Sequence, residues 1–371
     1  MTAVAQSAGV LSFEQAYATV LDYAARSQPE VTQAKEIALL NALGRVLAEP
    51  VLADRDFPPF PRATRDGYAL RAADLKTVPA TLRVVGQIAA GTAFAGRVSP
   101  GEAAEIMTGA ALPEGADAVV MVEYTAQASE SGHVEVQRAV SAGENVVARG
   151  AEARAGQHML ASGTPLAAAQ IALAAACGKA RVKVWRKPRV AILATGDELV
   201  EVSRTPSPFQ IRNSNTYSLA AQVEAAGGEA MRLPVAPDEP RKLAFLIYAG
   251  LEADILLLSG GVSMGKFDLV EQALQKMGAD FLFTGARIQP GRPVVFGEVK
   301  FSREGNGPGR SRSARDPGGL GEVRNRRGAI PFFGLPGNPV STMVCFDLFV
   351  RPVLQALSGA APARLPSAKA R

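Results

Sequence analysis

The stretch Asp254–Val270, DILLLSGGVSMGKFDLV, places an apolar run directly before a break at two glycines. An acidic residue then precedes sequence that is typical of a helix. In parallel sheets, ligands bind where a strand ends and its loop turns into a helix. The stretch therefore predicts a buried strand, a helix and a ligand-binding break between them.

The same alternation continues on both sides of this stretch. Further strands are predicted at RVAILA, EAMRLPVAP, PVVFGEV and AIPFFG, and further helices at NSNTYSLAAQVEAAGG, DEPRKLAFLIYAGLE and PVSTMVCFDLFVRPVLQAL. In the second of these helices, DEPRKLAFLIYAGLE, Asp238 is placed to act as the cap and Pro240 to lie in the first turn. Strands that alternate with helices indicate a parallel sheet with helices on both faces.

The N-terminal half has a different texture. Ser12–Arg26 is predicted to be a helix with Ser12 as its N-cap. The region from Pro50 to about Val140 is rich in glycine, proline and short alternating runs, which predicts a β-rich lobe. We therefore expect a multidomain α/β protein. The expected divisions are an N-terminal region 1–186 (helical at about 11–50 and 141–186, with the inserted lobe at about 51–140), an α/β domain 187–359 with an insertion at 300–327, and a tail 360–371.

The formal net charge of +5 is confined to one segment. Lys300–Arg327 carries eight basic and three acidic residues, which equals the whole excess, so the rest of the chain is neutral. The segment is rich in Gly, Arg and Ser without an apolar period, which is typical of a mobile loop. A solvated insertion is favoured over a loop that contacts RNA or membrane, and no nucleic-acid partner is expected.

The sequence shows no clear signal for export, for a membrane-spanning segment or for a zinc site. The N-terminus shows no signal peptide, and Leu166–Cys177 is too short to span a bilayer. The two cysteines lie in apolar, helix-like contexts, and there are only two histidines. We therefore expect a cytoplasmic protein with packed cysteines, no membrane association and no zinc site.

Three strand ends carry unusual loops. They are TGDE (Thr195–Glu198), SGGVSMGKFD (Ser259–Asp268) and GLPGNPVS (Gly334–Ser341). Glycines let backbone N–H groups approach an anion, and a following helix adds positive potential, so phosphate is the natural ligand. Any one of these loops alone is more simply a structural turn. Three at one sheet edge favour a binding site.

Acidic residues on these loops suggest a hard cation. Carboxylates beside a phosphate repel it unless Mg²⁺ bridges them, so Glu198 and Asp268 are candidate Mg²⁺ ligands. The alternatives stay open, because Glu198 could cap the helix after its turn and Asp238 is more simply a helix cap. In QPGRP (Gln289–Pro293), Arg292 either clamps an oxyanion or is a surface arginine in a turn.

Seven segments together resemble the MoeA family of molybdopterin molybdenumtransferases, which includes the gephyrin E domain. They are ATRDGYA, IMTGAALPEGADAVVMVE, VAILATGDELV, IRNSN, LLLSGGVSMGKFD, QPGRPVVFG and GLPGNPVS, in the family's order over about Leu11–Leu357. The resemblance implies that the region from about Arg189 is a three-layer, MogA-like molybdopterin-binding domain. It also implies the reaction, in which molybdate is inserted into adenylylated molybdopterin with Mg²⁺ and AMP is released.

The resemblance also assigns site residues and partners. The family's functional positions fall on Asp66, Thr108, Glu198, Asp238, Asp268, Pro336 and Pro339. For the pterin, its phosphate and molybdate we add the cofactor-binding candidates Thr195, Gly196, Ser259, Gly260, Gly261, Ser263, Arg292 and Ser341. The expected assembly is a homodimer whose site combines the α/β domain of one subunit with the β-rich lobe of the other, and a MogA-type adenylyltransferase is an expected partner.

The sequence also departs from the family pattern. No strand-rich segment follows LQALSGAAPARLPSAKAR, where the family usually has a small β domain, and Gln289 stands where some members have lysine. These departures keep a second interpretation open, a molybdopterin-binding module or scaffold with weak catalysis. A third, a MogA-type adenylyltransferase, fits less well, because that protein carries a TGGTG-like loop and lacks the N-terminal lobe.

Overall fold

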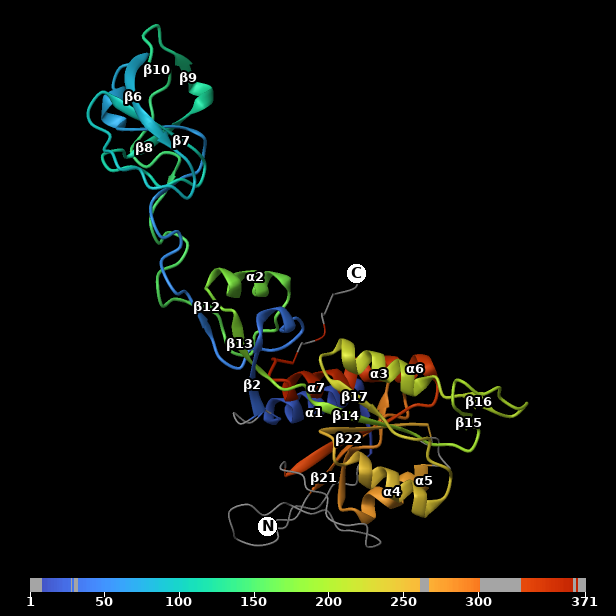
Figure 1. Cartoon of the computed structure of the whole chain (residues 1–371). Coiled ribbons are helices and arrows are strands. Elements are labelled where there is room, and N and C mark those ends of the chain that lie inside the picture. The colour runs from blue at the N-terminus through green and yellow to red at the C-terminus, as the bar shows by residue number, and fades with distance from the viewer. Residues whose placement is uncertain are drawn as a thin grey trace, which may run out of the picture. The chain divides into compact units, whose positions relative to one another are not determined.

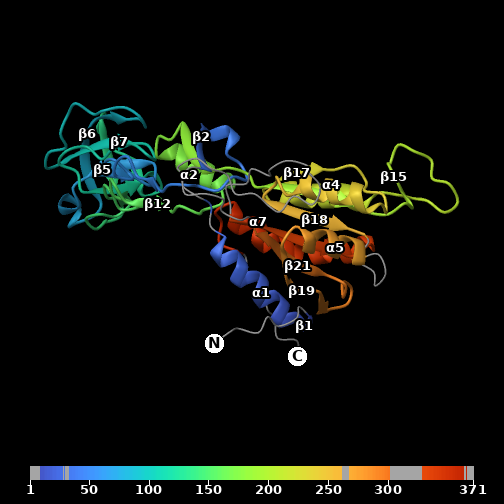
Figure 2. The same cartoon turned by 90° about the horizontal axis from the view of Figure 1, so that it is seen from below.

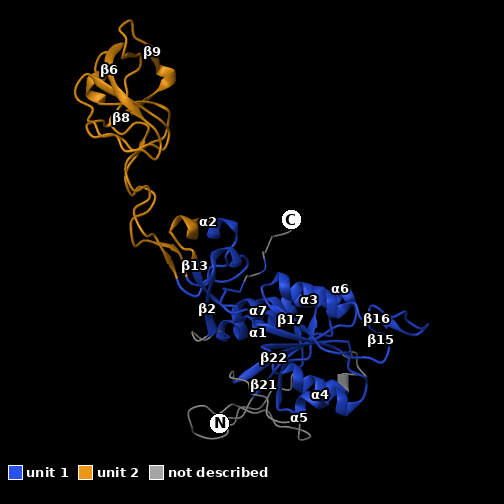
Figure 3. Cartoon of the chain, viewed as in Figure 1, with its two compact units in different colours: residues 1–49, 162–171, 181–371 blue, residues 50–161, 172–180 orange. Residues whose placement is uncertain are grey.

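The computed structural model describes residues 9–27, 29, 33–260, 267–300, 328–362 and 365, with the side chains of Phe267 and Asp268 left out of the description. The chain forms two compact units (Figure 3). The sheet unit comprises Met1–Glu49, Ser162–Ile171 and Arg181–Arg371, and the lobe unit comprises Pro50–Ala161 and Ala172–Ala180. The expected basic insertion lies outside the described residues from position 301 to 327.

A six-stranded mixed sheet organises the sheet unit. The strand order is β17 (Glu229–Arg232), β14 (Arg189–Ala194), β18 (Ile255–Ser259), β22 (Ala329–Leu335), β21 (Val295–Lys300) and β19 (Ala279–Phe283). The first four strands are parallel, and β21 and β19 are antiparallel to their neighbours. An entirely parallel sheet was expected. The difference arises because β21 and β22 are consecutive strands, and antiparallel neighbours need no helical crossover.

Helices cover both faces of this sheet (Figure 1). One core contains Ile192, Leu257 and Phe333 with residues of α1 (Phe13–Arg26), α3 (Asn215–Ala225) and the C-terminal helices. The other contains the next residues along the same strands, with residues of α4 (Pro240–Gly250) and α5 (Phe267–Lys276). Because side chains alternate across a strand, this pattern builds three layers and confirms the α/β fold class.

The first helix begins as its sequence predicts. The Ser12 hydroxyl accepts from the Gln15 N–H at 3.2 Å, and the Gln15 side chain accepts from the Ser12 N–H at 3.0 Å. This reciprocal pair satisfies two backbone donors that a helix start leaves open. The helix then packs beside α7 (Arg351–Leu357) (Figure 2).

Within the described part of the chain, one helical stretch is long and apolar enough to cross a membrane by length and composition alone. Pro339–Leu357 has a mean hydropathy of 1.4, and 61% of it is buried inside the protein. It consists of α6 (Pro339–Cys345), a π-helical turn (Phe346–Val350) and α7. Phe346, Phe349 and Val353 are fully buried in the core of the sheet unit. Such burial is typical of a core helix.

The remaining elements of the sheet unit are small. Strand β1 pairs in parallel with β20, β2 pairs with β13, and β15 pairs with β16. Their bounds, with that of the remaining helix, are β1 Val10–Ser12, β2 Ala34–Ala38, η2 Leu39–Asn41, β13 Arg181–Trp185, β15 Leu199–Val200, β16 Ile211–Arg212 and β20 Gly285–Arg287. Helix α2 (Ala168–Ala176) contains residues of both units.

The lobe unit is rich in strands. Its six-stranded sheet has the order β8, β5, β7, β6, β10, β9. Two short ladders join β11 to β4 and β12 to β3. The bounds are β3 Val51–Leu52, β4 Arg62–Ala63, β5 Gly67–Leu70, η3 Ala72–Leu75, β6 Ala80–Ile88, β7 Glu102–Ile106, β8 Ala118–Met121, η4 Val122–Tyr124, β9 Thr125–Gln127, β10 His133–Val136, β11 Val146–Val147 and β12 His158–Leu160.

Candidate functional site

The three predicted loops meet at one edge of the main sheet. Strands β14, β18 and β22 are neighbours, with Ala194 opposite Ser259 and Ser259 opposite Leu335. Because the three strands are parallel, the loops that leave their carboxyl ends lie side by side. This register brings Thr195–Glu198, Ser259–Gly260 and Pro336–Pro339 together, as the sequence predicts.

A cavity of about 110 Å³ lies between these loops and the start of α3. Five predicted site residues line it: Thr195, Glu198, Ser259, Gly260 and Pro339. We call this the site cavity. Its volume is below the few hundred Å³ typical of a whole ligand pocket, so it suits one part of a larger ligand.

Two glycines allow the loops their close approach. Gly260 has φ +82°, and a Cβ there would lie 2.9 Å from the Thr195 carbonyl oxygen. Gly196 is buried with φ +140°, and a Cβ there would lie 2.5–2.7 Å from the carboxylate atoms of Glu198. The Glu198 carboxylate thus lies in space that any other residue at 196 would fill.

A second carboxylate fixes the neighbouring turn. Asp197 Oδ1 accepts from the backbone N–H of Asp238 at 3.1 Å, and Gly196 N–H donates to the Ala236 carbonyl at 3.2 Å. These contacts hold Asp238 beside the TGDE loop. The expectation that Asp238 caps the helix is wrong: the N-cap of α4 is Glu239, which makes no side-chain capping bond, and Pro240 lies in the first turn as predicted.

The loop after β22 is held by its own side chains. Asn338 is the N-cap of α6, and its Oδ1 accepts from the N–H groups of Val340 and Ser341 at 3.1 and 3.2 Å. Ser341 is 8% exposed, and its hydroxyl lies 3.4 Å from the same oxygen. The Thr342 hydroxyl donates to the Pro336 carbonyl. The predicted residues Pro336 and Ser341 therefore take part in the hydrogen bonds that fix this loop.

Arg292 lies at the same sheet edge, outside the site cavity. It is exposed on the connection from β20 to β21, and β21 begins with Val295 opposite Gly334 at the end of β22. The remaining predicted residues, Gly261 and Ser263, lie outside the described residues. Asp268 is the second residue of α5, and its side chain is outside the description.

The asparagines of the site cavity were not among the predicted site residues. Asn213 and Asn215 line it, and Asn215 Nδ2 donates to the Ser259 hydroxyl at 3.1 Å and to the Gly337 carbonyl at 2.8 Å. Both belong to the segment IRNSN, which contributed to the family resemblance. The signal was two asparagines two positions apart at the start of a helix, between loops already assigned to a ligand.

The other predicted pair lies in the lobe unit. Asp66 Oδ1 accepts from the Thr108 N–H at 2.6 Å and from its hydroxyl at 2.7 Å. Both side chains are exposed. The Thr108 hydroxyl and N–H stabilise the carboxylate and lower the pKa of Asp66 below its usual value. The predicted residues thus form one ionised, oriented acceptor on the lobe surface.

The described residues suit Mg²⁺ only with help from a ligand. Among them, no group of three His, Cys, Asp or Glu side chains is placed to hold a metal ion. Mg²⁺ commonly takes one or two protein carboxylates and completes its octahedron with phosphate oxygens and water. The Glu198 carboxylate lines the cavity and lies in the space that the missing side chain of Gly196 leaves open. One such hard oxygen donor is enough for an ion that takes its other ligands from phosphate and water.

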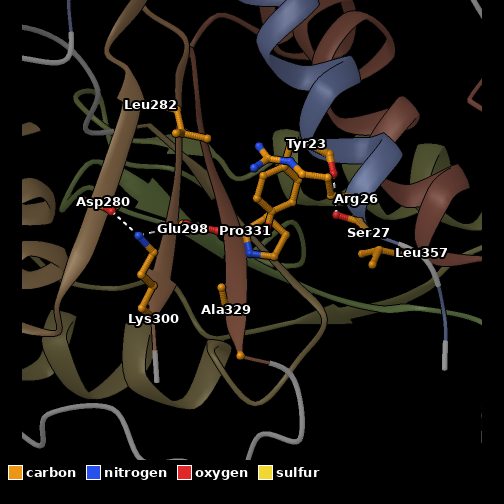
Figure 4. A pocket seen from close by; sticks show the side chains of 11 residues that line it. Tyr23, Arg26, Ser27, Asp280, Leu282, Glu298, Lys300, Ala329, Pro331 and Leu357 are labelled. Atoms are coloured by element: carbon orange, nitrogen blue, oxygen red, sulfur yellow. Dashed lines mark hydrogen bonds and ion pairs between the residues drawn. The ribbon is translucent and has the colours of Figure 1, made fainter. Parts of the chain in front are cut away.

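A second cavity of about 430 Å³ lies at the opposite end of the strands (Figure 4). Tyr23 and Arg26 of α1 face Asp280, Glu298 and Lys300 of the sheet across it. The Lys300 ammonium lies 2.5 Å from the Asp280 carboxylate and 3.4 Å from that of Glu298. None of the predicted site residues lines this cavity, so it is separate from the candidate site.

Comparison with known proteins identifies the family. Residues 11–178 match the MoeA N-terminal region (domain I and II), and residues 191–356 match a probable molybdopterin binding domain. A molybdopterin molybdenumtransferase of Nostoc sp. is 38% identical over 330 residues, which are 88% of this chain and 70% of the relative. The chain belongs to the MoeA family. A Bacillus subtilis member of the same name is 36% identical over 326 residues, covering 86% of this chain and 69% of the relative.

Solved MoeA structures have the same fold. A molybdopterin biosynthesis MoeA protein of Pyrococcus horikoshii superposes with a TM-score of 0.69 at 31% identity, covering 94% of this chain and 80% of the other. A second structure from that organism gives a TM-score of 0.71 at 29% identity, over 95% and 80% of the two chains. The resemblance drawn from the seven sequence segments is confirmed.

Proposed function

We propose that this MoeA-family chain is a molybdopterin molybdenumtransferase, which inserts molybdate into adenylylated molybdopterin and releases AMP. The observation that carries the proposal is the site cavity. Three loops, each predicted from sequence, meet there at the carboxyl edge of a parallel sheet. The chemistry at that edge, with glycine backbone, hydroxyl groups, amides and a carboxylate, suits a polar anionic ligand.

The cavity residues would orient one end of the substrate. Gly260 keeps the end of β18 free of a side chain, and Ser259 and Asn215 are joined by a hydrogen bond at 3.1 Å. Pro339, at the first position of α6, stiffens the loop opposite. A rigid frame of this kind lowers the entropy that must be lost when the reacting groups are brought together.

Glu198 would hold Mg²⁺, with Asp268 as the second predicted ligand. The bound ion would neutralise charge on the phosphoanhydride and position it. Molybdate is a substrate and is itself a dianion, so a second anion must be accommodated nearby. Arg292, exposed at the same sheet edge, supplies a guanidinium that suits an oxyanion. Ser341, the other residue predicted for molybdate, would act mainly through its contact with Asn338.

The lobe unit would complete the site in the assembled enzyme. Asp66, which Thr108 keeps ionised and oriented, suits contact with a metal-bound or hydrogen-bonding substrate group. The proposed assembly is a homodimer in which the lobe of one subunit serves the sheet unit of the other. A MogA-type adenylyltransferase would supply the adenylylated substrate. The two buried free cysteines suit a reducing, cytoplasmic setting.

The test is AMP release from adenylylated molybdopterin by the purified chain, with Mg²⁺, in the presence and absence of molybdate. We expect molybdate-dependent release that falls strongly in Asp66→Ala and Glu198→Ala. Lys242→Ala is the matched control, since it removes an exposed charge paired with Glu239, outside the site. Unchanged turnover in both site variants would refute the site assignment. Binding of adenylylated molybdopterin without molybdate-dependent AMP release would refute the transferase activity and favour a binding module with weak catalysis. The relatives, which are named as transferases, do not support that alternative.

A further inference from the structure

Two residues of the site cavity carry buried polar atoms without a partner. Across the described ranges, five buried side-chain nitrogen or oxygen atoms lack a hydrogen bond, and two of them are Asn213 Nδ2 and Asn215 Oδ1. Asn213 is 2% exposed. A buried polar atom without a partner costs free energy and is uncommon in native proteins. Both residues line the site cavity, so a molecule bound there is the natural partner for these two atoms.

The orientation of Asn215 follows from its partners. One end of its amide lies 2.8 Å from the Gly337 carbonyl oxygen, which can only accept. That end must therefore be the NH₂ group, and it also donates to the Ser259 hydroxyl at 3.1 Å. The oxygen consequently faces away from Gly337 and is the atom without a partner, so Asn215 offers an acceptor.

The orientation of Asn213 follows in the same way. Its side chain lies 3.4 Å from the Thr216 backbone N–H, which can only donate. The atom that faces Thr216 must be the oxygen, and the NH₂ group is left without a partner. The Asn213 backbone is itself fixed, since its N–H donates to the Val200 carbonyl at 2.9 Å. Asn213 thus offers a donor, and the cavity offers one donor and one acceptor.

This combination discriminates between ligand groups. A phosphate or molybdate oxygen accepts but does not donate, so on its own, without a bound cation, it would satisfy Asn213 and leave Asn215 unpaired. The edge of a nitrogen heterocycle carries an N–H beside a carbonyl or ring nitrogen, and it satisfies both. The cavity volume of about 110 Å³ also suits one edge of a ring system better than the whole substrate.

We propose that Asn213 and Asn215 are specificity-determining residues that bind the heterocyclic edge of the substrate. This inference rests on the proposed function and deepens it, since adenylylated molybdopterin carries two such edges, the pterin and the adenine. Asn213 donates to the ring's acceptor, and Asn215 accepts from its N–H or NH₂. The anionic groups of the substrate bind elsewhere along the same sheet edge.

The experiment compares the binding of three probes by calorimetry: AMP, free pterin and pyrophosphate. Asn213→Ser keeps an oxygen that can accept from Thr216 and removes the amide NH₂ group that would reach the ring. Asn213→Asp keeps the side-chain shape and replaces the donor with an acceptor. We expect both variants to bind AMP or pterin about tenfold more weakly, the usual value of one hydrogen bond. In Asn213→Ser, which keeps the charge, pyrophosphate binding should not change, and the probe that loses affinity identifies the ring.

The control variant is Gln222→Ser. Gln222 also lies on α3, its Oε1 is also buried without a partner, and it is not part of the site cavity. Its replacement should leave the affinity for all three probes unchanged. Thermal unfolding of each variant shows that the fold is retained. The acceptor role of Asn215 is tested on the unmodified chain with purine ribonucleotide, which lacks the 6-amino group of AMP, if AMP is the probe that responds.

The outcomes separate this inference from the proposed function. Equal binding by all variants, or an equal loss for pyrophosphate in the uncharged variant Asn213→Ser, would mean that the two amides hold only water, and would overturn the inference even if AMP release is normal. So would a failure of the unmodified chain to bind AMP or pterin. Selective loss of ring binding supports the inference even where molybdate-dependent release is absent. In turnover, Asn213→Ser should raise KM for adenylylated molybdopterin more than it lowers kcat.

Discussion

Replacing Gly196 with alanine would place a methyl group where the Glu198 carboxylate lies. The added Cβ would stand 2.5 Å from Oε2 and 2.7 Å from Oε1, far inside the sum of the contact radii, so the carboxylate must move. The backbone has φ +140°, which side chains rarely adopt. The strain from such a conformation costs roughly 1–3 kcal/mol of stability.

The consequence for activity should exceed the consequence for stability. A displacement of about 1 Å at a catalytic group can lower the rate on the order of 10²-fold. We therefore expect AMP release by Gly196→Ala to fall on that order, while the chain still folds. The assay is molybdate-dependent AMP release at saturating substrate, beside thermal unfolding of the same preparation.

The matched control for this change is Gly44→Ala, also in the sheet unit. Gly44 has φ +71° and no atom within 4 Å of an added Cβ, so its replacement brings backbone strain without a clash. It should lose a similar stability, roughly 1–2 kcal/mol, and keep its activity. Full activity in Gly196→Ala would refute the view that Glu198 must occupy the space beside Gly196.

Three further changes test other parts of the structure. The Asp254 carboxylate accepts from the Arg186 guanidinium at 2.6 and 2.7 Å, so Asp254→Ala leaves this guanidinium without its partner. The free energy of unfolding measured in urea should fall by about 3 kcal/mol, and a change near zero would contradict the geometry. Thr108→Val should raise the pKa of Asp66 towards its usual value in an NMR titration, because valine removes the hydroxyl that donates to the carboxylate; an unchanged pKa would mean that the hydroxyl plays no part. Since the pKa of Asp66 is lower in the folded chain than in the unfolded one, this contact stabilises the fold above the unfolded pKa, and the effect is lost as the pH falls through the folded pKa. Burial raises the pKa of Cys345 to about 12, so a thiol reagent at pH 8 should label this thiol only after denaturation. Rapid labelling of the native chain would show that the core around Cys345 opens.

Local sequence signals predicted much of the fold. The Ser12 capping box, the apolar strands and the glycine-rich strand ends depend on residues close together in the chain, and their interactions are short-range. The three loops could be placed at one edge because parallel strands end on the same side. Residue chemistry alone predicted only that the site binds an anion and a metal ion. The family resemblance was needed to name the substrate.

Other features depend on contacts that no local pattern encodes. The antiparallel direction of β21 follows from its direct pairing with β22, and the cap of α4 shifted from Asp238 to Glu239. The unpaired atoms of Asn213 and Asn215 are defined only once the loops are in place, since Asn215 contacts Gly337 across 122 positions of the chain. Single side-chain orientations of this kind require the folded structure.

The pairing of β3 with β12 has a consequence for the gene. Leu52 lies opposite His158 and Val51 opposite Leu160, so the first and last strands of the lobe run side by side. A coding segment whose product begins and ends at neighbouring points can be excised, or replaced by a homologous cassette, with little disturbance to the remainder. Recombination at these two positions would exchange the Asp66–Thr108 pair as a single inherited block.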